Sequence, residues 1–114
     1  MTKPFERETK KLDHLNGGAG FVILESLIND EQKGEHCGLF SRVTIKADCE
    51  LGYHEHHGET ETYYILSGKG MYDDNGKAVA VEAGDVLFCK DGDGHGMKNT
   101  GYADLEFIAL ILKK

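Results

Sequence analysis

The chain lacks several features that would place it in familiar classes of protein. Tryptophan is absent, proline occurs only at Pro4, and no apolar run approaches the roughly 20 residues that a membrane-spanning helix needs. The N-terminus has no apolar segment after its first charges, so it does not resemble a secretory signal. The three cysteines, Cys37, Cys49 and Cys89, lie far apart without a Cys-x-x-Cys motif, which is typical of reduced thiols. These absences predict a cytoplasmic protein.

Basic residues are also scarce. The chain has 13 Lys and Arg against 20 Asp and Glu, a formal net charge of -7. The few basic residues are scattered, and no basic stripe alternates with aromatic residues as in many nucleic-acid-binding surfaces. We therefore expect no nucleic-acid partner and no membrane association, and we interpret the acidity as favouring solubility.

Glycine-rich turns follow one another closely, and no stretch of useful length has helical periodicity. Residues 39–47 alternate, with Val43 and Ile45 on one face and Arg42 and Thr44 on the other, as in a half-buried strand. The length of 114 residues predicts a single domain. We predict an N-terminal arm over residues 1–20, partly extended, and an all-β domain over 21–114, with strands at 21–28, 39–47, 51–56, 61–66, 71–72, 77–82, 86–89 and 105–112.

Four potential metal ligands stand out: His54, His56, Glu61 and His95. Two histidines two residues apart share one face of a strand. The segment between His56 and Glu61 is long enough for a tight turn, so the carboxylate can return on a neighbouring strand. His95 is expected in a glycine-rich loop, 91–96. Three imidazoles and one carboxylate suit a divalent transition metal.

The neighbours of these residues have simpler interpretations. Glu55 and His57 are expected to point away from the ligand face, and Glu59 to be solvated in the turn. Tyr63 lies two residues after the carboxylate ligand, so it shares that face. It is either a core aromatic or a phenol that donates a proton or hydrogen bond near the metal. Tyr64 is expected to face the other way. Three apolar residues are expected in the core, or in a pocket wall: Phe40, Met71 and Phe88.

The spacing of the ligands also carries a family resemblance. Residues 54–68 read His-x-His-x4-Glu-x6-Gly, and residues 84–99 read Gly-x5-Lys-x-Gly-x2-His-x3-Asn. Together these patterns resemble the two signature motifs of the cupin superfamily, and with their strands they span roughly residues 40–112. Asp48 stands where the first motif normally opens with glycine, and Lys90 where the second normally has proline. Neither departure removes a ligand.

The resemblance implies a double-stranded β-helix, the jelly-roll or cupin barrel. It implies that His54, His56, Glu61 and His95 bind a divalent metal, whether Mn, Fe, Ni, Zn or Cu, from three adjacent strands and a loop. It also implies a homodimer, in which the first strand and arm of one chain add to the sheet of the other. The apolar C-terminal strand, 105–112, is compatible with such an interface.

Two functions follow from such a site. The first is a small metal-dependent enzyme, an oxygenase, isomerase or lyase, acting on a small organic or sugar-derived substrate with Tyr63 as the catalytic candidate. The second is a non-catalytic small-molecule-binding module with a metal anchor. Oxalate-cleaving cupins typically carry an arginine three positions before the first ligand histidine, where this chain has Leu51. A dicarboxylate is therefore not expected, and a small, partly apolar ligand is favoured.

Overall fold

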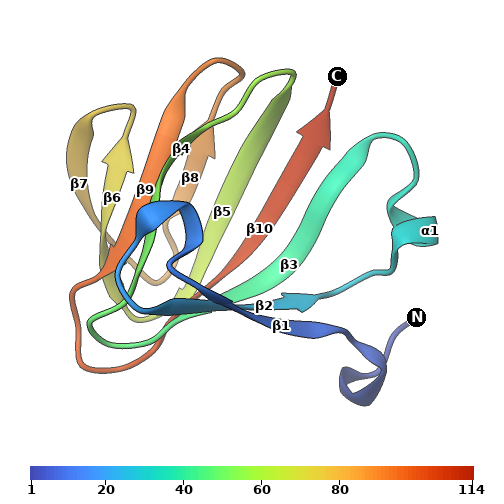
Figure 1. Ribbon diagram of the computed structural model, residues 1–114, viewed down its shortest axis with the longest axis horizontal. Coiled ribbons are helices and arrows are strands. Elements are labelled where there is room, and N and C mark those ends of the chain that lie inside the picture. Colours follow the sequence, from blue (N-terminus) through green and yellow to red (C-terminus); the bar gives the residue numbers. More distant parts are fainter.

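The structure, a computed structural model, describes residues 1–114 and is built almost entirely of strands (Figure 1). The strands form two antiparallel sheets, with a single turn of α-helix and two short 3-10 helices between or before them. The elements in chain order are η1 (Pro4–Glu6), β1 (Thr9–Asp13), η2 (Leu15–Gly17), β2 (Phe21–Ser26), α1 (Asp30–Lys33), β3 (Cys37–Ile45), β4 (Glu50–Glu55), β5 (Glu59–Ser67), β6 (Lys69–Asp74), β7 (Lys77–Glu82), β8 (Val86–Cys89), β9 (Gly94–Asn99) and β10 (Leu105–Lys113).

From β3 onward the chain passes repeatedly from one sheet to the other. The six-stranded sheet has the order β1-β2-β3-β10-β5-β8, and the four-stranded sheet has the order β4-β9-β6-β7. The last strand, β10, therefore lies between β3 and β5, as Figure 1 shows. The predicted hairpin between β6 and β7 is present, with Asn75 at φ 50° and Gly76 at φ 97° in its turn. This arrangement confirms the prediction of an all-β jelly-roll.

The core lies between the two sheets, where alternate residues of each strand meet. In β3, Val43 and Ile45 are buried whereas Arg42 is exposed, as the alternation predicts. Tyr63 and Phe107 pack against each other in this core, with tilted rings whose centroids are 4.4 Å apart. The buried cluster draws on most strands: Val22, Val43, Ile45, Cys49, Leu51, Tyr63, Ile65, Tyr72, Val81, Met97, Leu105, Phe107 and Ala109.

The first 20 residues are attached to the sheets rather than separate from them. Strand β1 pairs with β2 along its whole length. The segment that follows, including η2, lies against β4, where Glu50 N donates to Ala19 O at 2.9 Å. The N-terminal segment therefore covers one end of the gap between the sheets, close to the strand that carries His54.

Two residues expected in the core lie on the surface instead. Phe88 is 57% exposed and Met71 is 39% exposed. In β8, Leu87 and Cys89 face the interior, which turns Phe88 outward, and in β6 the inward positions belong to Gly70 and Tyr72. The core placement was wrong for both, because strand alternation decides the orientation, although Met71 lines a cavity at the surface.

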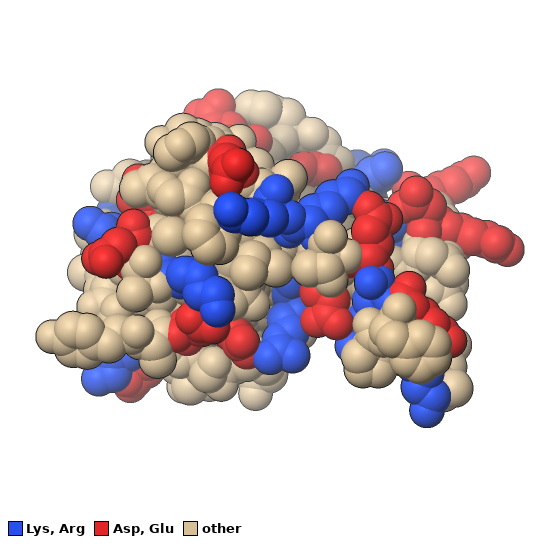
Figure 2. All heavy atoms as spheres, turned by 60° about the horizontal axis from the view of Figure 1, so that its bottom comes forward, with Lys and Arg blue, Asp and Glu red and all other residues tan.

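Acidic and basic side chains are interspersed on the surface that Figure 2 shows. Several form ion pairs, such as Lys46 Nζ with Asp104 Oδ2 at 2.8 Å and Arg7 Nη1 with Glu25 Oε2 at 3.1 Å. None of the helices has the length and apolar character that a membrane-spanning segment requires.

Candidate metal centre

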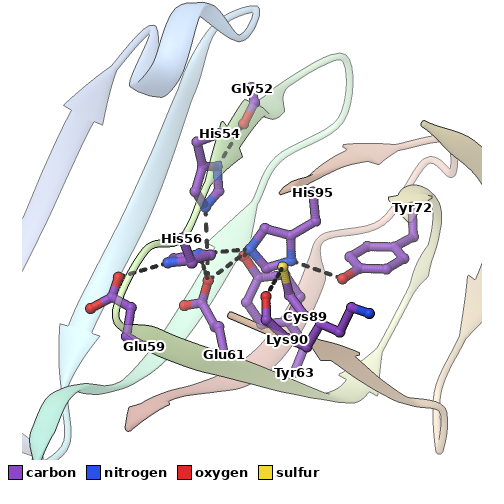
Figure 3. A network of polar contacts seen from close by, with 10 residues as sticks. All are labelled: Gly52, His54, His56, Glu59, Glu61, Tyr63, Tyr72, Cys89, Lys90 and His95. Carbon is purple, nitrogen blue, oxygen red and sulfur yellow. Dashed lines mark hydrogen bonds and ion pairs between the residues drawn. The ribbon is translucent and has the colours of Figure 1, made fainter. Parts of the chain in front are cut away.

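The structure brings the four predicted ligands together inside the barrel. His54 lies on β4, His56 directly after it, Glu61 on β5 and His95 on β9, and one donor atom from each lies within 4.8 Å of the others. Figure 3 shows the three imidazole rings directed toward the Glu61 carboxylate. Both sheets contribute, so the cluster exists only when the two sheets are packed.

One detail of the prediction was wrong, because His95 lies on a strand and not in a loop. The turn ends earlier, where Asp93 N donates to Lys90 O at 3.1 Å, and β9 begins at Gly94. His95 then pairs with His54 across the β4–β9 ladder. Neighbouring strands therefore fix the relative position of these two imidazoles.

The donor atoms converge on one oxygen. Glu61 Oε1 lies 2.9 Å from His56 Nε2, 2.9 Å from His95 Nε2 and 3.8 Å from His54 Nε2. The Nε2 atoms of His56 and His95 are 3.0 Å apart. Donor atoms that share one ion at about 2.1 Å are themselves about 3 Å apart. The spacing of this set therefore fits a transition-metal ion.

Each imidazole is held from behind through its Nδ1 atom. His54 Nδ1 lies 2.9 Å from the Gly52 carbonyl, and His95 Nδ1 lies 2.8 Å from the Tyr72 hydroxyl. His56 Nδ1 lies 2.7 Å from Glu59 Oε1. Glu59 was expected to be solvated, which was wrong: β5 begins at Glu59, so its side chain folds back onto the histidine that precedes the turn. Such partners orient metal-binding histidines.

These partners fix the protonation pattern of two of the rings. A carbonyl and a carboxylate can only accept, so Nδ1 of His54 and of His56 must donate. In the neutral imidazole, Nε2 then carries a lone pair. The lone pair of His56 Nε2 thus faces the Glu61 carboxylate oxygen at 2.9 Å. Two acceptors this close repel each other unless a proton or a metal cation lies between them.

The electrostatics of the cluster favour an ionised carboxylate. Burial alone would raise the pKa of Glu61, but the hydrogen bond from His95 and the nearby imidazoles, that of His54 included, lower it to about 2. Burial lowers the pKa of His95 below its usual value. Burial also acts to lower the pKa of His54, but the Glu61 carboxylate and the Gly52 carbonyl outweigh it and the pKa is raised. The carboxylate is therefore charged at any physiological pH.

A cavity of about 210 Å³ adjoins the cluster. His54, His56, Glu61 and Tyr63 form its inner end, and residues of η2, β2, β3 and β10 form its walls. The Tyr63 ring stacks on His95 with centroids 4.9 Å apart, and its hydroxyl lies 3.4 Å from His95 Nε2. Burial and the Glu61 charge raise the pKa of Tyr63 well above its usual range. The phenol is therefore neutral and can donate a hydrogen bond at the cavity.

The turn before β9 is ordered despite Lys90 in the place of the usual proline. Gly92 N donates to His56 O at 2.7 Å, and His56 N donates to Asp93 O at 3.1 Å. Asn99, at the end of the second motif, donates to Ile45 O at 2.8 Å and accepts from Gly101 N at 2.8 Å. Asn99 therefore orders the following loop. The backbone hydrogen bonds of the turn replace the rigidity that a proline would supply.

Sequence reasoning missed two partners of the ligands, Glu59 and Tyr72. Tyr72 is buried on β6, next to β9 in the sheet, and burial raises the pKa of its hydroxyl. The alternation of Gly70 and Tyr72 indicates an inward side chain, but only the order of the strands reveals that it reaches His95. For Glu59, the spacing of three residues from His56 was the available signal.

Comparisons with known proteins identify the family. The pattern that defines the cupin domain matches residues 41–111. The chain is 41% identical over 112 residues to a Thermotoga maritima protein named "Oxalate-binding protein", covering 98% of this chain and 93% of the relative. A crystal structure from Thermotoga maritima, of a protein described as a predicted oxalate decarboxylase, superposes with a TM-score of 0.94 at 38% identity, over 100% of this chain and 99% of that one.

A more distant structure shows the fold alone. The polyketide cyclase of Streptomyces resistomycificus superposes with a TM-score of 0.78 at 14% identity, covering 99% of this chain and 78% of that one. The match of the domain pattern over residues 41–111 and the 41% identical relative show that this chain belongs to the cupin family.

Proposed function

We propose that this cupin is a metal-dependent binding protein for small carboxylate ligands. The observation that carries the proposal is the contact between His56 Nε2 and Glu61 Oε1 at 2.9 Å, which a metal cation or a proton between them satisfies, beside an open cavity. The relative named "Oxalate-binding protein" makes oxalate the first ligand to test. A bound divalent ion would supply a positively charged Lewis acid that attracts carboxylate oxygens.

The residues of the site would have three roles: to hold the ion, to orient the imidazoles and to donate a hydrogen bond to the ligand. His54, His56, His95 and Glu61 would hold the ion, and their partners Gly52, Glu59 and Tyr72 keep the rings oriented. Tyr63, as a neutral phenol at the cavity, would donate a hydrogen bond to a ligand oxygen.

Oxalate is a dicarboxylate, whereas Leu51, in the place of an arginine, led us to expect no dicarboxylate ligand. The cavity has no lysine or arginine on its walls, and Leu51 lines it. A carboxylate that enters therefore finds no positive charge from the protein itself. If oxalate binds, its affinity must depend almost entirely on the metal, and removal of the metal must abolish binding.

The test is calorimetric titration of oxalate into protein loaded with Mn²⁺ or Ni²⁺ and into the same protein stripped with a chelator. The variant His56→Ala removes a ligand, and His57→Ala, at an exposed neighbouring position, is the matched control. We expect binding only by the metal-loaded wild type and by His57→Ala. Equal binding by the stripped protein, or none by the loaded protein, would contradict the proposal.

An enzymatic role is the second candidate, and the position of Tyr63 favours it. Its hydroxyl lies in the cavity beside His95, where a proton donor for a bound substrate would stand. No other proton donor lines the cavity apart from the cluster itself. Oxygen uptake and product analysis with oxalate and small sugar-derived acids test this role. A turnover that Tyr63→Phe abolishes without weakening ligand binding would establish it.

We also propose that two copies associate through the outer face of the six-stranded sheet. Residues in register across β8, β5 and β10 place Val86 next to Tyr64 and Tyr64 next to Ile108. Val86, Phe88 and Tyr64 are all exposed. The outer face of an antiparallel sheet is normally polar. An exposed apolar patch of this kind is typical of an interface.

A further inference from the structure

The walls of the cavity beyond the cluster are apolar. Nine of the 13 lining residues are hydrophobic, and three of the others belong to the metal cluster. Leu24 from β2 and Val43 from β3 are register partners, and with Ile111 from β10 they line the cavity from one sheet, with Leu15 of η2 also in the wall. The one remaining polar residue, Asn16, is exposed at the mouth. Most of the cavity is therefore suited to hydrocarbon.

No positive side chain is placed to meet a second carboxylate. The only arginines, Arg7 and Arg42, are paired elsewhere, with Glu25 and Glu106. A carboxylate that loses its water without gaining a partner is strongly disfavoured. The far end of a dicarboxylate would meet such walls here, whereas an alkyl group would be stabilised by them.

The charge of the cluster also favours a ligand with one carboxylate over a ligand with two. Three neutral imidazoles and one carboxylate around a divalent ion leave a single positive charge. A monoanion cancels that charge, whereas a dianion leaves a net negative charge in a largely apolar cavity.

We infer that the preferred ligand is a short-chain 2-oxo or 2-hydroxy monocarboxylic acid. Its carboxylate and neighbouring oxygen form the head, directed toward the cluster, and its alkyl tail lies against Leu24, Val43 and Ile111. This inference rests on the proposed binding function, and it names the class of ligand that the same site selects.

The experiment is a calorimetric series on the Ni²⁺-loaded full-length protein with oxalate, pyruvate, 2-oxobutanoate and 2-oxopentanoate. These 2-oxo acids share one head and differ by one methylene each. Burial of a methylene contributes about 0.8 kcal/mol, so we expect about a fourfold gain in affinity at each step. The longest acid should bind more tightly than oxalate.

A pair of variants on β2 tests whether the wall is responsible. Leu24→Lys places an ammonium group beside the cavity, whereas Ile23→Lys introduces the same residue on the opposite face of the same strand. Leu24→Lys should raise the affinity for oxalate and reduce the gain per methylene. Ile23→Lys should leave the series unchanged.

The outcomes separate this inference from the proposed function. Failure of the loaded protein to bind any of the acids would overturn both. Binding of oxalate with a flat 2-oxo acid series, or with oxalate the tightest ligand, would overturn the inference and leave the proposed function standing. A rising series that Leu24→Lys leaves unchanged would also overturn it, because the wall would then not be its cause.

Discussion

Replacement of Glu59 should weaken metal binding, although Glu59 is not itself a ligand. Its carboxylate accepts from His56 Nδ1 at 2.7 Å, a short charge-assisted bond that keeps Nε2 directed toward the cluster. Loss of such a partner typically costs about 10- to 100-fold in metal affinity. The Glu59 side chain is 28% exposed, which screens its charge. We therefore expect about tenfold for Glu59→Gln, which keeps an acceptor, and a larger loss for Glu59→Ala.

The chain offers a closely matched control. Glu55 contacts His57 at 3.3 Å, but both side chains are well exposed, at 56% and 72%. Competition with a metal-binding dye measures the affinity of wild type, Glu59→Gln, Glu59→Ala and Glu55→Gln, and thermal melts without metal show whether each folds. Glu55→Gln should match the wild type. A folded Glu59→Ala protein with unchanged affinity would refute the argument that the orientation of His56 depends on this contact.

Three further predictions follow from the site and the surface. His56→Ala should lose most of its bound metal while the circular dichroism spectrum is retained, whereas retained stoichiometric metal would contradict the ligand set. Metal affinity should fall as the pH decreases below neutral, because protons compete with the metal for the imidazoles. His54, with its raised pKa, should protonate at higher pH than an unperturbed histidine, while Glu61 stays ionised down to about 2. Phe88→Glu should shift the protein to monomer in light scattering, and a wild-type monomer would contradict the proposed interface.

Part of the cluster of candidate ligands was predictable because it depends on local spacing. Residues two apart on a strand point to the same face, so His54 and His56 could be assigned to one site from the sequence alone. The prediction that Glu61 and His95 join them at the same site required the spacing of two motifs and their resemblance to a known family. The hairpin at Asn75-Gly76 was predictable for a local reason too, because few residues adopt positive φ readily.

The features that were missed depend on strand order or on which face of a strand is turned inward. Tyr72 reaches His95 because β6 lies beside β9, and nothing in the sequence near Tyr72 specifies that neighbour. Phe88 is exposed because Cys89 and Leu87 take the inward positions of β8. The cavity beside the cluster is bounded by Leu15, far from the ligand motifs in sequence, because the N-terminal segment lies against β4.

The contact between the N-terminal segment and β4 depends on Gly52, which lies outside both motif patterns. A Cβ added at Gly52 would lie 2.1 Å from Asn16 O and 2.8 Å from Gly18 N, both backbone atoms that cannot move independently of the chain. Gly52→Ala should therefore push the segment around η2 away from β4, at a cost of about 1–3 kcal/mol in the free energy of unfolding. Gly101→Ala is the control, since its added Cβ would have only ordinary contacts, the nearest at 3.7 Å.

Chemical denaturation measures the loss of stability, and hydrogen exchange at the Glu50 amide, which donates to Ala19 O, measures the displacement. Faster exchange at Glu50 in Gly52→Ala, with Gly101→Ala unchanged, would show that this close approach holds the N-terminal segment over the cavity. If Gly52→Ala is as stable as the wild type and Glu50 remains protected, the segment is held by other contacts. Those other contacts, and not Gly52, would then position Leu15 in the cavity wall.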